Sequence, residues 1–189
     1  MGRSARPVVI VVCGALGLTA CDLLHVLGGT LSYVHPGPFG QAWWVPLEFT
    51  LATVAMLAGA ALFAGDRPAP APAGREVATA ALWFAAAYAA SALAAPEHPW
   101  ALAGGLWVLA LARIAHSSDR RALVPFAVLL AVSGCATELA ISATGAFEYA
   151  GPDGYVVPWL SALYVIGAPL ALALARLLPA GSVLRAARR

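Results

Sequence analysis

The feature that most constrains this chain is a series of six apolar stretches, each close to the length at which a helix crosses a bilayer. About 20 residues at 1.5 Å each cover the ~30 Å hydrocarbon layer. Lipid cannot hydrogen-bond the backbone, so such stretches must be helices that pack together. The chain of 189 residues, 61% hydrophobic with mean hydropathy +0.81, is therefore predicted to be a single-domain, all-α integral membrane protein. We place the spans at 7–28, 41–64, 77–95, 99–116, 122–144 and 156–178.

The positions of the basic residues predict the topology. All 11 are Arg, and they lie before the first span, in the links after the second and fourth spans, and at the end of the chain. The other three links contain no Arg. The positive-inside rule therefore places both termini in the cytoplasm and predicts three helical hairpins that point outward. These Arg clusters are short and adjoin helix ends, so we expect no nucleic-acid partner.

Composition bears on where the protein resides. Ala is abundant and Arg has wholly replaced Lys, which favours a GC-rich bacterial genome. We expect a multi-pass protein of the bacterial plasma membrane, or of the endoplasmic reticulum if the source is eukaryotic.

A weak internal repeat relates the first two spans to the last two. Both segments are an outward-running helix, an outer loop and an inward-running helix, so the predicted repeat is parallel. Chance matching in a biased composition is the alternative, but Tyr, Pro and Trp in one register favour duplication. The paired loops would either anchor aromatic side chains at the membrane interface or form a lid over a cavity. At an offset of 116 residues, Asp22, Gly29, Tyr33, Pro36 and Trp43 recur as Glu138, Gly145, Tyr149, Pro152 and Trp159.

Three acidic residues inside the predicted spans are the main functional candidates, because a carboxyl group is costly in hydrocarbon. They are Asp22 in the first span, Glu48 in the second and Glu138 in the fifth. In one interpretation they hold the polar head of a lipid or sterol between helices. In the other they make interhelical hydrogen bonds, with Asp22 paired to His25 on the same helical face. A proton relay is a third possibility, which the lack of a continuing ladder of acids disfavours.

Motifs for soluble-type catalysis are absent from the sequence. It contains no nucleophile elbow, H-E-x-x-H motif or P-loop. It has no dense Asp cluster that would hold Mg²⁺ and a diphosphate. The three Cys residues lie in predicted spans without a C-x-x-C motif, so we expect neither a metal nor another cofactor.

Motifs in both halves of the repeat resemble those of one family. Residues 42–46 read A-W-W-V-P, and residues 22–25 upstream read D-L-L-H. Residues 145–153 read G-A-F-E-Y-A-G-P-D and precede Trp159-Leu160. These segments are similar to the A-W-W-V-P, the N-L-L-Q and the Y-x-x-P-D followed by W-L-P of the Insig family. Insig proteins are endoplasmic-reticulum membrane proteins that regulate sterol synthesis.

The resemblance implies a six-helix bundle that catalyses no reaction and binds a lipid, sterol-like or glycerolipid, in an intramembrane cavity. It also implies regulation of lipid metabolism through contacts with a partner membrane protein. Asp119 and Arg120 resemble the family's cytoplasmic D-R step, whose acid is associated with binding of Scap, so we assign them to partner binding. Small residues on the third and fourth spans suit a homo-oligomer, with a trimer as the working assumption. The lipid-binding candidates are Asp22, His25, Trp43, Tyr88, Ser91, Glu138, Thr144 and Tyr149.

A second resemblance covers one segment only. Glu138-x6-Gly145, followed by Phe147 and Tyr149, is similar to membrane enzymes that hydrate or cyclise carotenoids. In that alternative the three intramembrane acids, kept protonated by burial, would protonate a polyene double bond. Because the match is short, we rank the non-enzymatic function first.

Overall fold

The computed structural model describes residues 5–64, 71–151 and 157–178, and one helix corresponds to each predicted span. The largest differences are at the starts of α2 and α6, which lie at 45 against a predicted 41 and at 160 against a predicted 156. The predicted all-α fold class is confirmed, with one addition described below. The helices are α1 Ala5–Leu27, α2 Val45–Ala64, α3 Gly74–Ala94, α4 Pro99–Ala115, α5 Arg120–Ser142 and α6 Leu160–Arg176.

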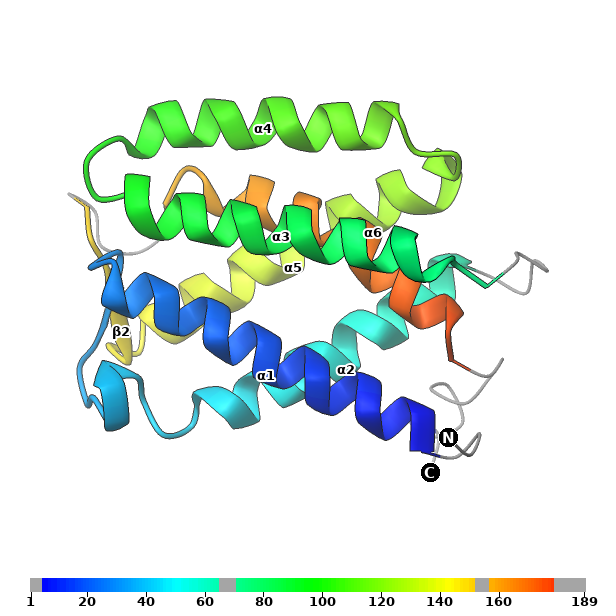
Figure 1. Cartoon of the computed structure of the whole chain (residues 1–189). Coiled ribbons are helices and arrows are strands. Elements are labelled where there is room, and N and C mark those ends of the chain that lie inside the picture. Colours follow the sequence, from blue (N-terminus) through cyan, green and yellow to red (C-terminus); the bar gives the residue numbers. More distant parts are fainter. Residues whose placement is uncertain (1–4, 65–70, 152–156, 179–189) are drawn as a thin grey trace.

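Four helices, α1, α2, α3 and α5, are long and apolar enough to cross a bilayer. The apolar helices α4 and α6 have 17 residues each, which is about 26 Å of helix and slightly less than a hydrocarbon layer. Figure 1 shows that α1, α3 and α5 begin, and α2, α4 and α6 end, at the same end of the bundle. The described Arg residues lie at or near these ends, as the predicted topology requires. Six spans and cytoplasmic termini remain predictions.

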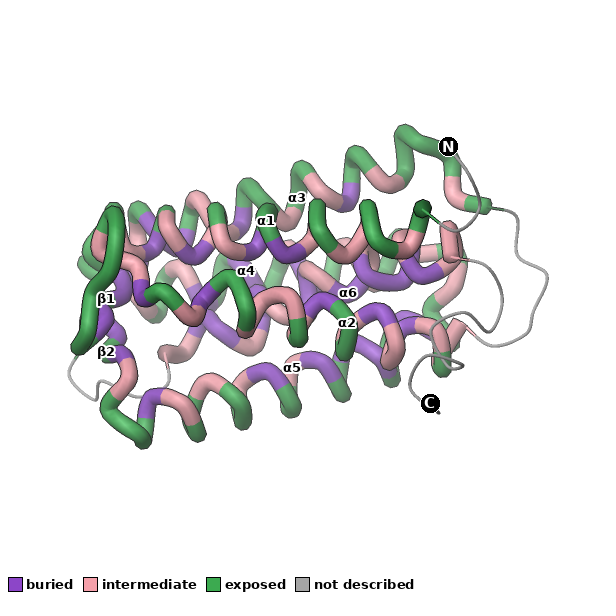
Figure 2. Tube along the Cα trace, turned by 90° about the horizontal axis from the view of Figure 1, so that it is seen from below, coloured by how far each residue is buried: buried purple, intermediate pink, exposed green. Residues whose placement is uncertain are grey.

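Helix α6 forms the centre of the bundle. It contacts α2, α3, α4 and α5, and more of its residues are buried than in any other described helix. Figure 2 shows buried positions concentrated along α6, whereas the outer faces of the surrounding helices are exposed. Large apolar side chains such as Leu16, Leu51 and Leu82 lie on those outer faces. An apolar exterior around a close-packed centre is what a bundle surrounded by lipid requires.

A short antiparallel ribbon, which the sequence analysis did not predict, joins the outer ends of two helical hairpins. Strand β1, Leu31–Tyr33, follows α1, and strand β2, Phe147–Tyr149, follows α5. The two strands lie side by side at one end of the bundle (Figure 1). Gly29 and Gly145, with φ of 70° and 75°, turn the chain from each helix into its strand, a conformation that favours glycine. We call the end of the bundle that carries this ribbon the outer end.

The ribbon relates the two halves of the internal repeat by a local two-fold rotation. Leu31 pairs with Tyr149, and Tyr33 pairs with Phe147, so an offset of 116 residues carries each pair onto the other. The flanking backbone bonds obey the same offset. Val34 N–H donates to the Ala146 carbonyl at 3.2 Å, and Ala150 N–H donates to the Thr30 carbonyl at 2.9 Å.

After the ribbon the offset changes from 116 to 115 residues. Equivalent hydrogen bonds lie at the starts of α2 and α6. The Glu48 N–H donates to the Trp44 carbonyl at 3.0 Å, and the Leu163 N–H donates to the Trp159 carbonyl at 3.2 Å. The structural counterpart of Trp159 is therefore Trp44, and the predicted pairing of Trp43 with Trp159 is wrong by one residue. The second loop is one residue shorter than the first, and a constant offset cannot represent that difference.

Candidate functional site

Two carboxyl groups lie beneath the ribbon, and each accepts hydrogen bonds from two side chains. The Tyr33 hydroxyl donates to both carboxyl oxygens of Asp22 at 2.9 and 3.0 Å, and Gln41 Nε2 donates to Asp22 Oδ2 at 2.7 Å. In the other half, the hydroxyls of Tyr149 and Tyr164 each donate to Glu138 at 3.1 Å. Tyr33 and Tyr149 are equivalent in the repeat, so the two halves share one bond of each pair.

The third acid, Glu48, has no side-chain hydrogen bond within the described part of the chain. It is half-buried near the start of α2, and it interacts electrostatically with Asp22 and Glu138. The three carboxyl groups, from α1, α2 and α5, are therefore near enough to interact through their charges, and we call them the cluster. At the offset of 115 residues, Glu48 corresponds to Leu163, a buried side chain that is 2% exposed.

The cluster lies close to the outer end of the bundle. Asp22 lies five residues before the end of α1 at Leu27, and Glu138 lies four residues before the end of α5 at Ser142. Glu48 lies three residues after the start of α2. At 1.5 Å per residue these positions are roughly 5–8 Å from the helix ends. The cluster therefore lies near one end of the helices and not midway along them.

A second group of polar side chains adjoins the carboxyl groups. His25 Nε2 lies 2.7 Å from the Ser91 hydroxyl, which itself lies 2.9 Å from the Tyr88 carbonyl. The direction of the bond between His25 and Ser91 depends on the tautomer of the imidazole. The His25 ring also stacks on Tyr88, with centroids 4.9 Å apart. His25 is thus bonded to Ser91 rather than to Asp22, the partner that the structural interpretation of the sequence gave it.

Trp159 occupies the centre of these contacts. Its ring meets His25 edge-on at 5.2 Å and Tyr149 edge-on at 5.9 Å. The side chain is 0% exposed, yet Nε1 has no hydrogen-bond acceptor among the described residues. A buried N–H group without an acceptor costs about 1–3 kcal/mol. An acceptor supplied by a guest molecule would remove that cost.

The ribbon tyrosines act as permanent donors. Burial, reinforced by the negative charge of Asp22, raises the pKa of the Tyr33 hydroxyl above its ordinary value. Burial and the neighbouring Glu138 raise the pKa of Tyr149 in the same direction. Both hydroxyls therefore stay protonated at neutral pH, and each donates a hydrogen bond to its acid.

Six of the eight predicted lipid-binding residues converge on this cluster, namely Asp22, His25, Tyr88, Ser91, Glu138 and Tyr149. Two do not. Trp43 is 73% exposed at the surface, and Thr144 is exposed with its hydroxyl bonded to the Ile141 carbonyl of its own helix. Prediction omitted Gln41 and Tyr164, which are ordinary residues in the sequence and join the cluster only through the packing of the bundle. It also omitted Tyr33 and Trp159, although the repeat had marked both.

The predicted partner-binding residues lie at the opposite end of the bundle, in the link between α4 and α5. Asp119 caps α5 by accepting from Ala122 N–H at 3.4 Å, and it forms an ion pair with Arg176 of α6. Arg120 donates to the Ala115 carbonyl at the end of α4. These contacts give both residues a role in holding the link, whether or not a partner binds there.

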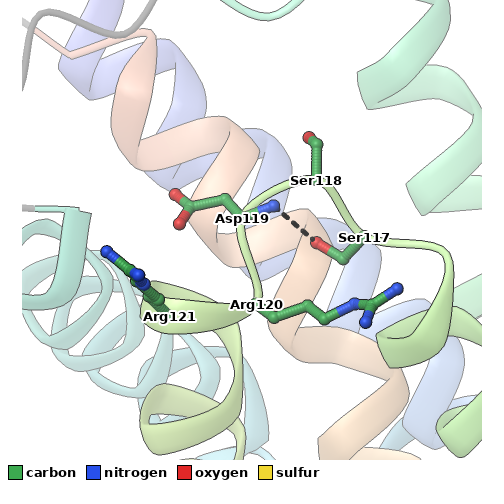
Figure 3. Close-up of a pocket in the computed structure, with 5 residues that line it drawn as sticks. All are labelled: Ser117, Ser118, Asp119, Arg120 and Arg121. Atoms are coloured by element: carbon green, nitrogen blue, oxygen red, sulfur yellow. Dashed lines mark hydrogen bonds between the residues drawn. The ribbon is translucent and has the colours of Figure 1, made fainter.

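A surface pocket of about 500 Å³ marks the same link. In Figure 3 the Asp119 backbone N–H donates to the Ser117 hydroxyl, and the side chains of Arg120 and Arg121 point in different directions. Two Arg side chains that diverge do not form a shared anion site. The pocket is lined by Ser117, Ser118, Asp119, Arg120 and Arg121.

The helical bundle has the same fold as a class of membrane proteins of known structure, the bacterial Insig homologues. The chain superposes on the mycobacterial Insig homologue MvINS from Mycobacterium vanbaalenii with a TM-score of 0.76 at 24% identity, over 91% of this chain and 93% of that one. A cross-linked MvINS trimer gives a TM-score of 0.76 at 25% identity, over 98% and 96%. The resemblance inferred from the sequence motifs is thereby confirmed, and the chain has the fold of this bacterial Insig homologue.

Comparison by sequence adds nothing to this identification. No protein-family model matches the chain, and no curated protein shows a significant match to it.

Proposed function

We propose that this Insig-type protein is not an enzyme and binds a lipid, sterol-like or glycerolipid, with its polar head in the cluster beneath the ribbon. The observation that carries the proposal is the Trp159 indole N–H, fully buried beside His25 and Tyr149 and without an acceptor among the described residues. Buried polar groups that lack a protein partner form hydrogen bonds with a bound water or with a ligand. A lipid head at this depth would supply an acceptor while its tails extend between the helices.

Apolar burial supplies little selectivity for such a ligand. Lipid tails are already dry in the bilayer, so their transfer into a protein groove removes little area from water. Discrimination between lipids must come from the few polar contacts at the head and from shape. This makes the side chains around Trp159 the natural targets for a test.

The first prediction concerns Trp159→Phe, which removes the indole N–H and keeps most of the ring. Extracted in mild detergent, the wild-type protein should carry one lipid per chain in native mass spectrometry. The variant should retain that lipid roughly tenfold less well, as loss of about 1.4 kcal/mol predicts. Trp43→Phe is the matched control, because Trp43 is exposed, and it should behave like the wild type. A wild-type protein free of lipid would refute the proposal.

The arrangement of donors also bears on the carotenoid alternative. An acid catalyst must release a proton to its substrate, whereas Asp22 and Glu138 each accept from two side chains. Two of the three acids that this alternative invokes are thus unsuited to that role. Membranes that contain the protein should therefore leave an added polyene such as lycopene unchanged, and measurable hydration or cyclisation would reverse our ranking.

Regulation and assembly are proposed by analogy with the homologues. We propose that the protein controls lipid metabolism through contacts between membrane helices, with the link at Asp119 and Arg120 as the contact surface. We also propose self-association in a bacterial plasma membrane, since the homologue MvINS has been cross-linked as a trimer. Cross-linking in native membranes, read out as the mass of the product, tests the assembly.

A further inference from the structure

We infer that the link between α1 and α2 contains a strap, residues 36–41, that opens and closes over Asp22, with the side-chain amide of Gln41 as its latch. The proposed function gives the cluster a ligand, whereas this inference concerns how solvent at the outer end reaches one of its acids. It follows from three observations: the contacts of Gln41, the close approach of the strap to α1, and the backbone conformation of Phe39.

The side chain of Gln41 ties the strap to α1. Its Nε2 donates to Asp22 Oδ2 at 2.7 Å and to the Thr19 carbonyl at 2.9 Å, so the amide uses both of its protons on α1. Among the described residues, the donors to the Asp22 carboxyl are Gln41 and Tyr33, and both belong to the link between α1 and α2. Displacement of the strap therefore removes one donor and leaves the Tyr33 bond in place.

The latch is specific to the first half of the repeat. At offsets of 116 and 115 residues, Gln41 corresponds to residues 157 and 156, and both are Val, which has no side-chain donor. In the second half, the second donor to Glu138 is Tyr164, a residue of α6. The acid of the second half is thus held by a helix, and Asp22 is held by a segment that lies outside both of its helices.

The backbone of the strap lies directly on α1. A Cβ added at Gly40 would lie 2.9 Å from Cγ1 of Val26, and the φ of 83° at Gly40 also favours glycine. Within the strap the chain closes on itself, because Gly37 N–H donates to the Gln41 carbonyl at 2.8 Å and Gly40 N–H donates to the Gly37 carbonyl at 3.2 Å. The strap is therefore a compact unit that can move as a whole, and access to Val26 reports its position.

The conformation of Phe39 opposes the latch. Its φ and ψ are 60° and 17°, in the left-handed region that a residue with a Cβ adopts at a cost. Among the described residues it is the one non-glycine with a positive φ, and its ring is 81% exposed, so packing offsets little of that cost. The strain favours the open strap and the two bonds of Gln41 favour the closed one. Opposed contributions of similar size keep the two positions close in free energy, as a gate requires.

The test measures how often the strap leaves α1. In a protein that lacks the three native cysteines, Val26→Cys places a thiol beneath Gly40, and Leu27→Cys, at a position that is 70% exposed, is the matched control. Reaction of the detergent-solubilised protein with a water-soluble maleimide is followed by mass. The thiol at position 26 should react at least tenfold more slowly than the thiol at position 27. Gln41→Leu should raise the rate at position 26 roughly tenfold and leave the rate at position 27 unchanged.

Two substitutions at Phe39 test the opposing strain. Phe39→Gly removes the cost of the positive φ, so it should slow the reaction at position 26 about fivefold. Phe39→Ala removes the ring and keeps the Cβ, so the thiol at position 26 should react as it does with Phe39 present. A reaction that slows equally in both variants would assign the effect to the ring and overturn the inference.

Equal rates at positions 26 and 27 also overturn the inference, as does a rate at position 26 that Gln41→Leu leaves unchanged. If Gln41→Leu raises both rates because the protein unfolds, Phe39→Gly decides: a slower reaction at position 26 supports the strap, and an unchanged one overturns it. None of these rates requires a bound lipid, so the inference and the proposed function fail separately.

Discussion

At the scale of single residues, the structure depends on tyrosine hydroxyls that reach across from the ribbon to intramembrane acids. The donor and acceptor of each pair are 11 residues apart, with a helix end and a glycine turn between them. Each bond thereby fixes the position of a strand relative to the helix that precedes it. Since both tyrosine hydroxyls hold their protons more tightly when folded, these bonds also have a pH dependence.

The residue-scale prediction concerns Tyr33→Phe. Loss of the donor should lower the free energy of unfolding by about 1–3 kcal/mol at pH 8. Because folding raises the Tyr33 pKa above its ordinary value of 10.0, the wild-type advantage is complete below about pH 10 and shrinks as the pH rises further. Unfolding midpoints of the detergent-solubilised protein at pH 8 and pH 11 measure both effects. Ser32→Ala, on the exposed side of the same strand, is the control.

A constant difference between Tyr33→Phe and the wild type from pH 8 to pH 11 would contradict this account. It would mean that the hydroxyl stabilises the fold by packing alone and not as a proton-holding donor.

At the scale of elements, close approach of α5 and α6 depends on the absence of a side chain. A Cβ added at Gly134 of α5 would lie 2.4 Å from the ring of Tyr164 in α6. That ring carries the hydroxyl that donates to Glu138. A small residue on one helix thus makes room for a donor on the next, as is common between membrane helices.

We therefore predict that Gly134→Ala displaces the Tyr164 ring and breaks its bond to Glu138. Overpacking of this kind typically costs about 1–3 kcal/mol, which the thermal midpoint in detergent would register as a clear decrease. Gly104→Ala in α4 is the matched control, because no atom lies within 4 Å of its added Cβ, and it should be neutral or slightly stabilising. Equal midpoints for the two variants would argue against this packing.

The helices were predictable from the sequence, whereas the ribbon was not. Apolar runs of about 20 residues specify a membrane helix through length alone. Leu31–Tyr33 and Phe147–Tyr149 are each three residues long, too short for any periodicity, and each strand exists only because the other lies beside it. The repeat marked Tyr33 and Tyr149 as equivalent. Their hydrogen bonds to the acids depend on the glycine turns, whose geometry only the structure shows.

At the scale of the whole molecule, the predicted topology places the ribbon outside and the α4–α5 link in the cytoplasm. In a variant without Cys13, Cys21 and Cys135, a cysteine introduced at Ser118 should react with a membrane-impermeant maleimide only after the cells are opened. A cysteine at Ser32 should react in intact cells. Mass shifts of the purified protein measure both reactions, and the reverse pattern would invert the topology.

The sequence predicted only in part which side chains converge at the site. Intramembrane acids are conspicuous in any apolar sequence, so Asp22, Glu48 and Glu138 were recognised at once. Their convergence depends on which helix faces meet, and helical register alone does not supply that. Thr144 and Trp43 illustrate the limit, since both are polar or aromatic near a span end and both face away from the cluster.

The central position of α6 has a consequence for biogenesis. The ribosome makes this helix after α2, α3, α4 and α5, yet all four pack against it. Until α6 enters the membrane, the earlier helices lack the helix against which they pack, and their mutual arrangement is provisional. Packing of the bundle should accordingly be completed in a single step once α6 is inserted, and nascent chains stalled before residue 160 should remain open to proteases of the membrane.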